Sequence, residues 1–282
     1  MPDKNEEAGK QTLKVAFQGE RGAYSESAVY RFFGGPAEVK PCRDFKDVFK
    51  SVEEQETDFG VVPVENSIEG SVNQTYDLFL KHDLKVRGEI IVKIEHCLIA
   101  NPGTKLEDVK AVYSHPQALA QCRTFLEKSG WELVPTYDTA GSVKILKEKG
   151  LKNAAALASE KAAELYKMKI LAREIADNPE NYTRFFVIGK EDAPMTGKDK
   201  TSVIFAATHK PGALYYALGE FAKRGINLTK IESRPTKQTP WEYNFYLDFE
   251  GNKSEPRCAE ALEALKEHAA FIKILGSYPR AA

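Results

Sequence analysis

The chain has 282 residues, of which 42% are hydrophobic and 29% are charged, and its formal net charge is −1. This length exceeds what one small core accommodates, so we expect two or more packed units. The near-zero charge gives no electrostatic reason to expect nucleic acid or an anionic membrane as a partner. No apolar run approaches the ~20 residues that span a bilayer. Residues 1–11 lack the apolar core of a signal peptide and are expected to form the disordered tail of a cytoplasmic protein.

The sequence contains no recognisable metal or nucleotide motif. The cysteines are scattered, without a C-x-x-C pair or a histidine at ligand spacing, so we expect reduced, buried thiols rather than zinc or disulfides: Cys42, Cys97, Cys122 and Cys258. No H-E-x-x-H or acidic cluster suggests a metal. The spacing of Gly19 and Gly22 is too short for a dinucleotide fingerprint. We therefore expect no cofactor.

From Thr12 to Gly189, short apolar runs alternate with amphipathic segments, which is typical of an α/β unit. The runs predict strands at Leu13–Phe17, Phe59–Val64, Ala111–Tyr113, Ala154–Ala158 and Arg184–Ile188. Helical apolar spacing occurs in Val29–Phe33, Tyr76–Leu80, Leu119–Leu126 and Val143–Leu146.

Small polar residues gather where strands lead into helices. They occupy residues 18–25, 65–71, 114–117 and 159–160, and Ser114 with Gln117 forms a predicted capping box. In an open α/β sheet such junctions meet at the carboxyl ends of the strands, where ligands bind. Several helix N-termini around one crevice suit a small dianion. The alternative, that each junction is only a helix cap, stays open.

A polar stretch, residues 191–200, predicts a linker, and a second pattern follows it. Strand Thr201–Thr208 precedes a helix that begins near Gly212 and ends at Gly225. Strand Asn227–Arg234 comes next. A third strand, a second helix and a last strand then follow, marked by Tyr243 to Phe249, Cys258 to Leu265 and Phe271 to Leu275. The order βαββαβ indicates a ferredoxin-like unit.

Three segments resemble the prephenate dehydratase family. They are Pro63-Val64-Glu65-Asn66-Ser67 with Gly70, then Thr183-Arg184-Phe185, and finally Glu232-Ser233-Arg234-Pro235 after Gly212-Ala213-Leu214. The resemblance runs from about Leu13 to Tyr278. It implies a carbon–oxygen lyase that converts prephenate to phenylpyruvate in phenylalanine biosynthesis, without a cofactor and under feedback inhibition by L-phenylalanine.

The resemblance also implies an α/β catalytic region, 12–190, with two lobes similar to type II periplasmic-binding proteins. Lobe one would comprise 12–92 and 171–190, and lobe two 93–170, with the active site in the cleft between them. A C-terminal ACT domain, 201–282, agrees with the βαββαβ pattern. ACT domains usually pair, so a homodimer or homotetramer is expected. No chorismate mutase segment precedes the first strand, which favours the monofunctional form.

Thr183 matches the essential catalytic hydroxyl of the family, and Glu65 and Asn66 match positions in or beside its site. Glu65 is either the proton source or an acceptor for a helix start. The candidates for substrate binding are Gln18, Ser25, Ser67, Ser114, His115, Gln121, Ser159, Arg184 and Phe185. Arg184 either binds a carboxylate or forms an ion pair. Phe185 lines the cleft or the core, and His115 is either a donor or a structural residue.

The same resemblance predicts a phenylalanine site in the ACT domain, formed by Gly212, Ala213, Leu214, Asn227, Leu228, Glu232, Ser233, Arg234 and Pro235. Tyr215 departs from the usual Val, which leaves the affinity for phenylalanine open. Two other functions remain: an arogenate dehydratase, which performs the same elimination on the transaminated substrate, and a non-catalytic sensor of small anions.

Overall fold

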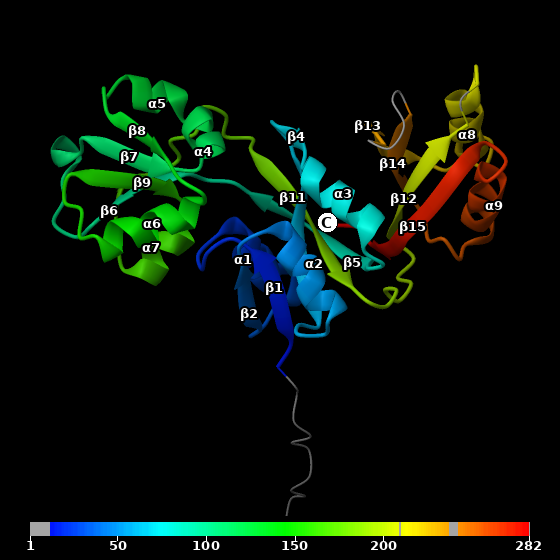
Figure 1. Ribbon diagram of the computed structural model, residues 1–282, viewed down its shortest axis with the longest axis horizontal. Coiled ribbons are helices and arrows are strands. Elements are labelled where there is room, and N and C mark those ends of the chain that lie inside the picture. The colour runs from blue at the N-terminus through cyan, green and yellow to red at the C-terminus, as the bar shows by residue number, and fades with distance from the viewer. Residues whose placement is uncertain (1–11, 209, 237–241, 282) are drawn as a thin grey trace, which may run out of the picture. The chain divides into compact units, whose positions relative to one another are not determined.

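The computed structural model describes residues 12–208, 210–236 and 242–281, and these residues form three β-sheets with flanking helices (Figure 1). The predicted tail, 1–11, lies outside the described residues. The chain divides into two compact units. One contains the residues up to Asn73 together with Ile91–Phe185, and the other contains Gln74–Ile90 and the residues from Phe186 onward.

The first sheet has the strand order β2-β1-β3-β11-β5, and β4 pairs with β3. Val15, Ala16 and Phe17 in β1 are fully buried, as expected for an apolar run in a central parallel strand. Its strands are β1 (Lys14–Gln18), β2 (Glu38–Cys42), β3 (Phe59–Asn66), β4 (Gly70–Ser71), β5 (Lys85–Lys93) and β11 (Tyr182–Gly189). Its helices are α1 (Tyr24–Phe33), α2 (Phe45–Glu53) and α3 (Asn73–Lys81).

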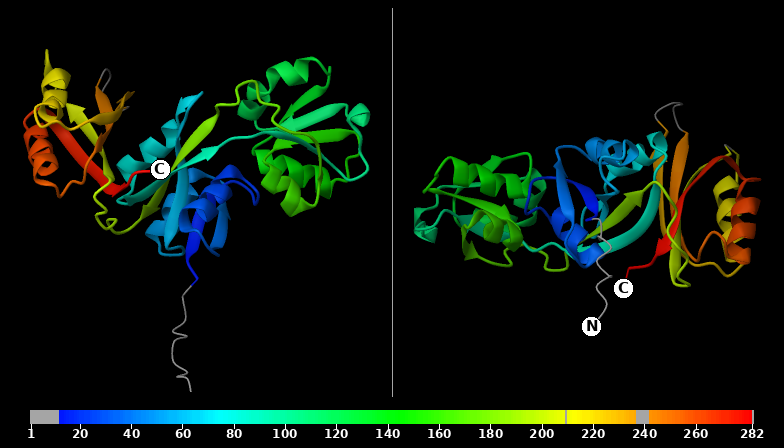
Figure 2. Two further views of the ribbon diagram at one scale, coloured as in Figure 1. Left: turned by 180° about the vertical axis from the view of Figure 1, so that it is seen from behind. Right: turned by 90° about the horizontal axis from the view of Figure 1, so that it is seen from below.

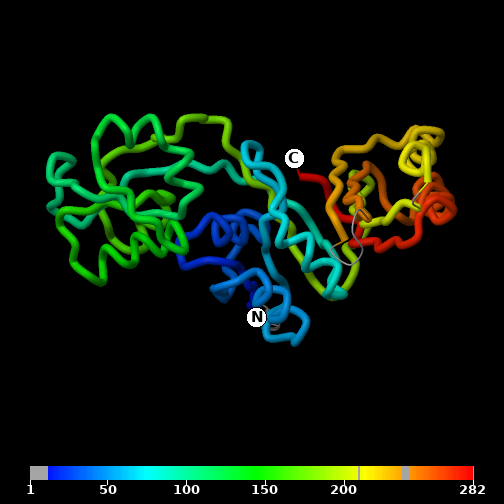
Figure 3. Tube along the Cα trace, turned by 45° about the horizontal axis from the view of Figure 1, so that its top comes forward, coloured from blue at the N-terminus to red at the C-terminus, as the bar shows by residue number. Residues whose placement is uncertain are grey.

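The second sheet is also mixed, with the strand order β10-β6-β9-β7-β8. Helices α4 and α5 lie on one face of this sheet and α6 and α7 on the other (Figure 1). Its strands are β6 (Cys97–Ala100), β7 (Ala111–Ser114), β8 (Glu132–Pro135), β9 (Ala154–Ala158) and β10 (Lys169–Ala172). Its helices are η1 (Leu106–Asp108), α4 (Pro116–Gln121), α5 (Arg123–Glu127), α6 (Thr139–Glu148) and α7 (Glu160–Tyr166). The chain enters this sheet from β5 and leaves it toward β11 (Figure 3).

The third sheet, here called the C-terminal sheet, is antiparallel, with the order β13-β14-β12-β15. Its strands are β12 (Asp199–Ala207), β13 (Leu228–Pro235), β14 (Tyr243–Glu250) and β15 (Ala269–Pro279), and its helices are α8 (Ala213–Ala222) and α9 (Pro256–Leu265). Both helices cover the same face (Figure 2). The ferredoxin-like unit predicted from the sequence is confirmed, although β12 begins at Asp199, inside the expected linker.

The other face of the C-terminal sheet packs against residues 74–90. The rings of Tyr76 and Tyr246 lie 4.6 Å apart, and the carboxylate of Asp77 pairs with Arg234 at 3.3 Å. Lys200 pairs with the buried carboxylate of Glu89 at 3.1 Å. Because both of its faces are covered, the central strand β14 buries polar as well as apolar side chains.

Two local predictions for α4 and α5 are wrong. The predicted helix Leu119–Leu126 is interrupted at Cys122. Asp177 binds the backbone on both sides of the break: its carboxylate accepts the N–H of Thr124 (3.1 Å), and its backbone N–H donates to the Gln121 carbonyl (2.8 Å). The predicted capping box of Ser114 and Gln117 does not form. His115 caps α4 instead, with Nδ1 accepting from the Gln117 N–H, while Ser114 belongs to β7.

Candidate active site

Thr183 and Asn66 meet on the first sheet. Asn66 ends β3, and Thr183 lies on the neighbouring strand β11. The side-chain N–H of Asn66 donates to Thr183 Oγ1 at 3.0 Å, and the two residues are only 7% and 9% exposed. Strands that are remote in sequence therefore bring together the two residues that the family motifs single out.

The amide of Asn66 is fixed at both ends. Its oxygen accepts the backbone N–H groups of Ile68 (3.0 Å) and Glu69 (2.9 Å), in the turn that leads to β4. Its nitrogen also donates to Asn181 Oδ1 (2.7 Å) and to the carbonyl of Tyr182 (3.1 Å). Since Asn66 donates to Thr183 Oγ1, the hydroxyl hydrogen of Thr183 points elsewhere. No described residue accepts it.

The hydrogen-bond network continues from Asn66 into the second sheet's helices. Asn181, fully buried, donates through its amide nitrogen to Gln121 Oε1 at 2.9 Å. His96 Nε2 lies 3.1 Å from the same oxygen. The sequence reasoning named Gln121 but missed Asn181 and His96. The position of Asn181, two residues before Thr183, was the one available signal.

A pocket of about 470 Å³ opens beside Asn66. Its wall consists of Asn66, the turn 69–72, the start of α4 at 115–117, and Ala120. Gln117 and Gln121 lie four residues apart on α4. Gln117 lines the pocket, whereas Gln121 belongs to the network that holds Asn66. The pocket is large enough for a small organic acid.

Glu65 and Arg184 lie on the opposite side of their strands from Asn66 and Thr183, because side chains alternate along a strand. Arg184 Nη1 is 3.5 Å from Glu65 Oε2. Glu65 and Arg184 thus form an ion pair on the side of the strands away from Thr183, and whether Arg184 also binds a carboxylate stays a prediction.

The hydroxyls of three predicted binding residues bind the backbone. Ser67 donates to the Glu180 carbonyl (3.0 Å), Ser114 to the Leu157 carbonyl (2.7 Å) and Ser159 to the Gly22 carbonyl (2.7 Å). Gln18, Ser25 and Phe185 do not line the pocket beside Asn66. Gln18 donates to the Arg43 carbonyl, and Ser25 and Phe185 are buried.

The loop after β1 contacts the starts of α6 and α7. Gly22 has φ +89°, and a Cβ there would approach Ala162 Cα to 2.8 Å, so only glycine fits. The Glu20 carboxylate accepts from Tyr137 and pairs with Lys144 (3.1 Å each). Burial raises the pKa of Asp138, the N-cap of α6, and raises the pKa of Tyr137 to about 12.

Among the described residues, no group of three or more His, Cys, Asp or Glu side chains could hold a metal ion, and all four cysteines are free and buried. No helix in the described part of the chain is long and apolar enough to cross a membrane. The predicted cytoplasmic location stays a prediction.

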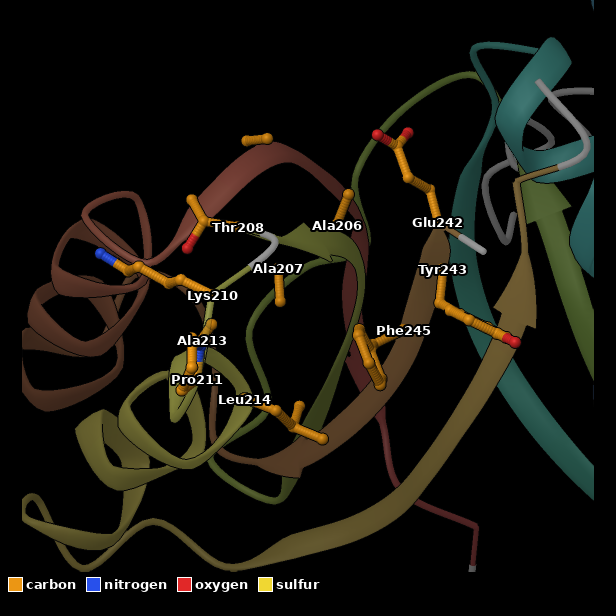
Figure 4. A pocket seen from close by; sticks show the side chains of 11 residues that line it. Ala206, Ala207, Thr208, Lys210, Pro211, Ala213, Leu214, Glu242, Tyr243 and Phe245 are labelled. Carbon is orange, nitrogen blue, oxygen red and sulfur yellow. The ribbon is translucent and has the colours of Figure 1, made fainter. Parts of the chain in front are cut away.

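A second pocket, of about 490 Å³, lies at one end of the C-terminal sheet (Figure 4). Ala213 and Leu214 line it from the start of α8, and Glu242, Tyr243 and Phe245 from β14. Gly212, the N-cap of α8, has φ +79°. The segment Glu232–Pro235 does not line this pocket within one chain, although Pro235 pairs with Tyr243. Leu228 begins β13 at its far end and Asn227 precedes it, and both are likewise absent from the wall.

Comparison with known proteins decides the family. The profile of the family described as "Prephenate dehydratase" matches residues 15–193, which is more than half of the chain, and that of the ACT domain matches residues 201–267. The chain belongs to the prephenate dehydratase family. The family predicted from the sequence motifs is confirmed, as are the α/β class of the first two sheets and the C-terminal ACT domain.

Curated relatives cover nearly all of the chain. It is 49% identical over 272 residues to the bifunctional chorismate mutase/prephenate dehydratase of Aquifex aeolicus, covering 95% of this chain and 74% of that protein. It is 44% identical over 278 residues to arogenate dehydratase/prephenate dehydratase 2 of Arabidopsis thaliana, covering 95% and 73%.

Two solved structures are also similar over 95% of this chain, each with a TM-score of 0.86 and 34% identity. One is prephenate dehydratase of Arthrobacter aurescens in complex with L-Phe, 90% of which is covered. The other is GqqA, described as a quorum quenching acylase, 98% of which is covered.

Proposed function

We propose that this chain is a prephenate dehydratase, a carbon–oxygen lyase that removes carbon dioxide and water from prephenate to give phenylpyruvate. The observation that carries the proposal is the hydrogen bond from Asn66 to Thr183, in a chain of this family. Because Thr183 Oγ1 accepts from Asn66, its own hydrogen is available to another acceptor.

The reaction requires orientation and one proton. As the carboxylate leaves as carbon dioxide, the electron pair of its C–C bond moves into the ring and the ring C–O bond breaks. The departing hydroxide takes up a proton and leaves as water. Threonine is a weak acid, so we assign Thr183 the role of a fixed hydrogen-bond donor to the departing oxygen, where negative charge develops. Because Asn66 is held by four further hydrogen bonds, the position of this donor is set before the substrate arrives.

The departing hydroxide also needs a proton, which need not come from a carboxyl group. Glu65, the sequence-based candidate, faces Arg184 on the other side of the strand. We therefore propose that Glu65 stabilises the β3–β11 pairing. The Thr183 hydroxyl passes its proton to the leaving oxygen and takes up a replacement proton from solvent.

Arogenate is the second candidate substrate, because several curated relatives carry that name, including the one from Arabidopsis thaliana at 44% identity. Prephenate and arogenate differ in a keto versus an ammonium group. Side-by-side kinetics of the purified protein on both acids, with kcat/KM as the measure, test the assignment. A preference for arogenate would replace the proposed substrate, and no turnover of either would favour the non-catalytic sensor.

We also propose the lobe boundaries 12–92 with 171–190, and 93–170. They are supported by the strands of the first sheet, which lie within 14–93 and 182–189, and by those of the second sheet, which lie within 97–172.

The pocket of the ACT domain is proposed to bind L-phenylalanine and inhibit the enzyme. Its wall joins the apolar side chains of Leu214 and Phe245 to the hydroxyl of Thr208, which is buried without a hydrogen-bond partner among the described residues. A polar group in this position suits an amino-acid ligand. Since Glu232 to Pro235 do not line the pocket in one chain, we propose that a second subunit supplies them, in a homodimer or homotetramer.

Calorimetry and inhibition kinetics on the intact enzyme test this regulatory site. Leu214→Ala should weaken both binding and inhibition about tenfold or more. Leu218→Ala is the matched control, because Leu218 lies on the same helix and packs on the same core without lining the pocket. Equal effects of the two variants, or no inhibition at millimolar phenylalanine, would contradict the assignment. Light scattering gives the number of subunits, and a monomer that still binds phenylalanine would refute the shared pocket.

A further inference from the structure

The segment Glu232–Pro235 on β13 presents its side chains to two different faces of the C-terminal sheet. In the pairing of β13 with β14, Ser233 lies opposite Phe245, and Pro235 lies opposite Tyr243. Residues that are directly paired share a face of the sheet. Phe245 and Tyr243 line the pocket beside α8 (Figure 4). Ser233 and Pro235 therefore lie on the pocket side of the sheet.

The two charged residues of this segment face the other way. Glu232 lies opposite Tyr246, whose ring is 4.6 Å from that of Tyr76 on α3. The guanidinium of Arg234 pairs with the carboxylate of Asp77 on the same helix at 3.3 Å, and the two side chains are only 13% and 31% exposed. One short segment of β13 thus has one face on the pocket side and contacts α3 through the other.

The ion pair of Arg234 and Asp77 has a tighter arrangement within reach. Both carboxylate oxygens lie near a single nitrogen, Nη2, at 3.3 and 3.4 Å. Charge-assisted hydrogen bonds are about 2.7–2.9 Å long, and this kind of pair is strongest when two nitrogens each hold one oxygen. The neighbouring Nε of Arg234 is buried and has no hydrogen-bond partner among the described residues. A small shift of β13 along α3 would give Asp77 both nitrogens.

Helix α3 follows directly on the wall of the active-site pocket. Ser71 and Val72 line that pocket, and α3 begins at the next residue, Asn73. Asp77 lies four residues further along, which is about one helical turn. Packed helices shift as units when a protein switches between two arrangements. A shift of α3 at Asp77 therefore also moves the end of the helix that is joined to the pocket wall.

We propose that the Asp77–Arg234 ion pair transmits phenylalanine binding in the ACT domain to the active-site wall. The proposal rests on the proposed function and adds the connection by which the regulatory ligand acts. Phenylalanine holds β13 from the pocket side and so favours one arrangement of the ion pair over the other. Helix α3 carries this difference to residues 69–72. Coupling between two sites typically changes affinity about 5- to 150-fold.

The first test removes the charge of Asp77 and keeps its shape. Asp77→Asn should leave kcat/KM without phenylalanine within about threefold of the starting protein, because Asp77 does not line the active-site pocket. Calorimetry should still show phenylalanine binding. At phenylalanine about tenfold above the Kd of each protein, Asp77→Asn should keep more than about half of its activity, whereas the starting protein should lose most of its own.

Two further variants separate transmission from a general effect of charge. Asp77→Glu keeps a carboxylate for Arg234 and should retain inhibition. Asp83→Asn is the matched control, because it removes a carboxylate from the same segment, residues 74–90, where Asp83 is 83% exposed and pairs with Lys85. It should be inhibited like the starting protein. The proposal is overturned if Asp77→Asn is fully inhibited, if it no longer binds phenylalanine, or if Asp77→Glu or Asp83→Asn loses inhibition to the same extent.

Hydrogen exchange of the intact protein, measured by mass spectrometry, tests the connection without any activity. Saturating phenylalanine should change the exchange of the backbone amides in residues 69–81 of the starting protein, and this change should be absent from Asp77→Asn. No change in the starting protein overturns the inference, even if the variants do not fold. Conversely, a change in a protein that turns over neither prephenate nor arogenate would refute the proposed function and leave the connection intact.

Discussion

Replacing Thr183 by valine removes one hydroxyl and keeps the branched shape. The loss of a donor aimed at a developing negative charge costs about 2.7–4 kcal/mol, so we expect kcat to fall about 10²–10³-fold. KM should change little, because the interaction forms mainly in the transition state. Asn66 loses one acceptor but keeps Asn181 Oδ1 and the Tyr182 carbonyl, so the stability cost should be about 1 kcal/mol.

Thr183→Ser is the matched control, since it keeps the hydroxyl that accepts from Asn66. It should lose less than about tenfold in kcat. The assay is the ultraviolet absorbance of phenylpyruvate, measured beside a thermal melt of each variant. If valine and serine lower kcat equally, or if valine lowers it less than about fivefold in a folded protein, Thr183 is not the donor and the argument from Asn66 fails.

Three further predictions concern charge, metal and pH. Glu65→Gln should keep kcat within about tenfold, because Glu65 pairs with Arg184 away from Thr183; a loss as large as that of Thr183→Val would restore Glu65 as the proton source. Activity should survive dialysis against a chelator, and loss of turnover that one divalent ion restores would contradict this. Burial lowers the pKa of His96, so the folded state binds a proton at this ring more weakly than the unfolded state does. The contribution of His96 to the free energy of unfolding is therefore present above pH ~6.5 and is lost as the pH falls below that value. The melting temperature of His96→Gln should therefore drop less between pH 7 and pH 5 than that of the starting protein, and equal drops would refute this assignment.

Elements with a strong apolar pattern could be predicted from the sequence. The run Ala154–Ala158 forms β9 with the predicted limits, and all five of its residues are buried. In contrast, β2 was not predicted, because Glu38–Cys42 is mostly exposed and has no apolar run. The break between α4 and α5 depends on Asp177, which lies 53 residues from Thr124, and no local pattern contains that information.

The candidate site, too, could be predicted only in part from the sequence. Short motifs identified Asn66 and Thr183, and the structure joins them by a hydrogen bond. The positions of Glu65 and Arg184 depend on which side of the strand each faces, since side chains alternate along β3 and β11, and the sequence alone left both alternatives for Arg184 open. Asn181 contacts Asn66, which is 115 positions away in the sequence, and His96 contacts Gln121, which is 25 positions away. These contacts cannot be predicted from local sequence patterns.

The packing of the C-terminal sheet on residues 74–90 affects how feedback-resistant variants should be made. Tyr278, fully buried, lies with its ring 5.5 Å from that of Phe186, and Glu89 accepts from Lys200 and from the Ala281 N–H. A Cβ at Gly276 would come within 2.5 Å of the Val86 carbonyl oxygen. Cutting the chain before β12 would remove these partners and expose the surface they cover, which favours aggregation. Residues 74–90 and the C-terminal sheet should thus unfold in one calorimetric transition. Relief from inhibition is better sought by single substitutions in the pocket at α8 than by deletion.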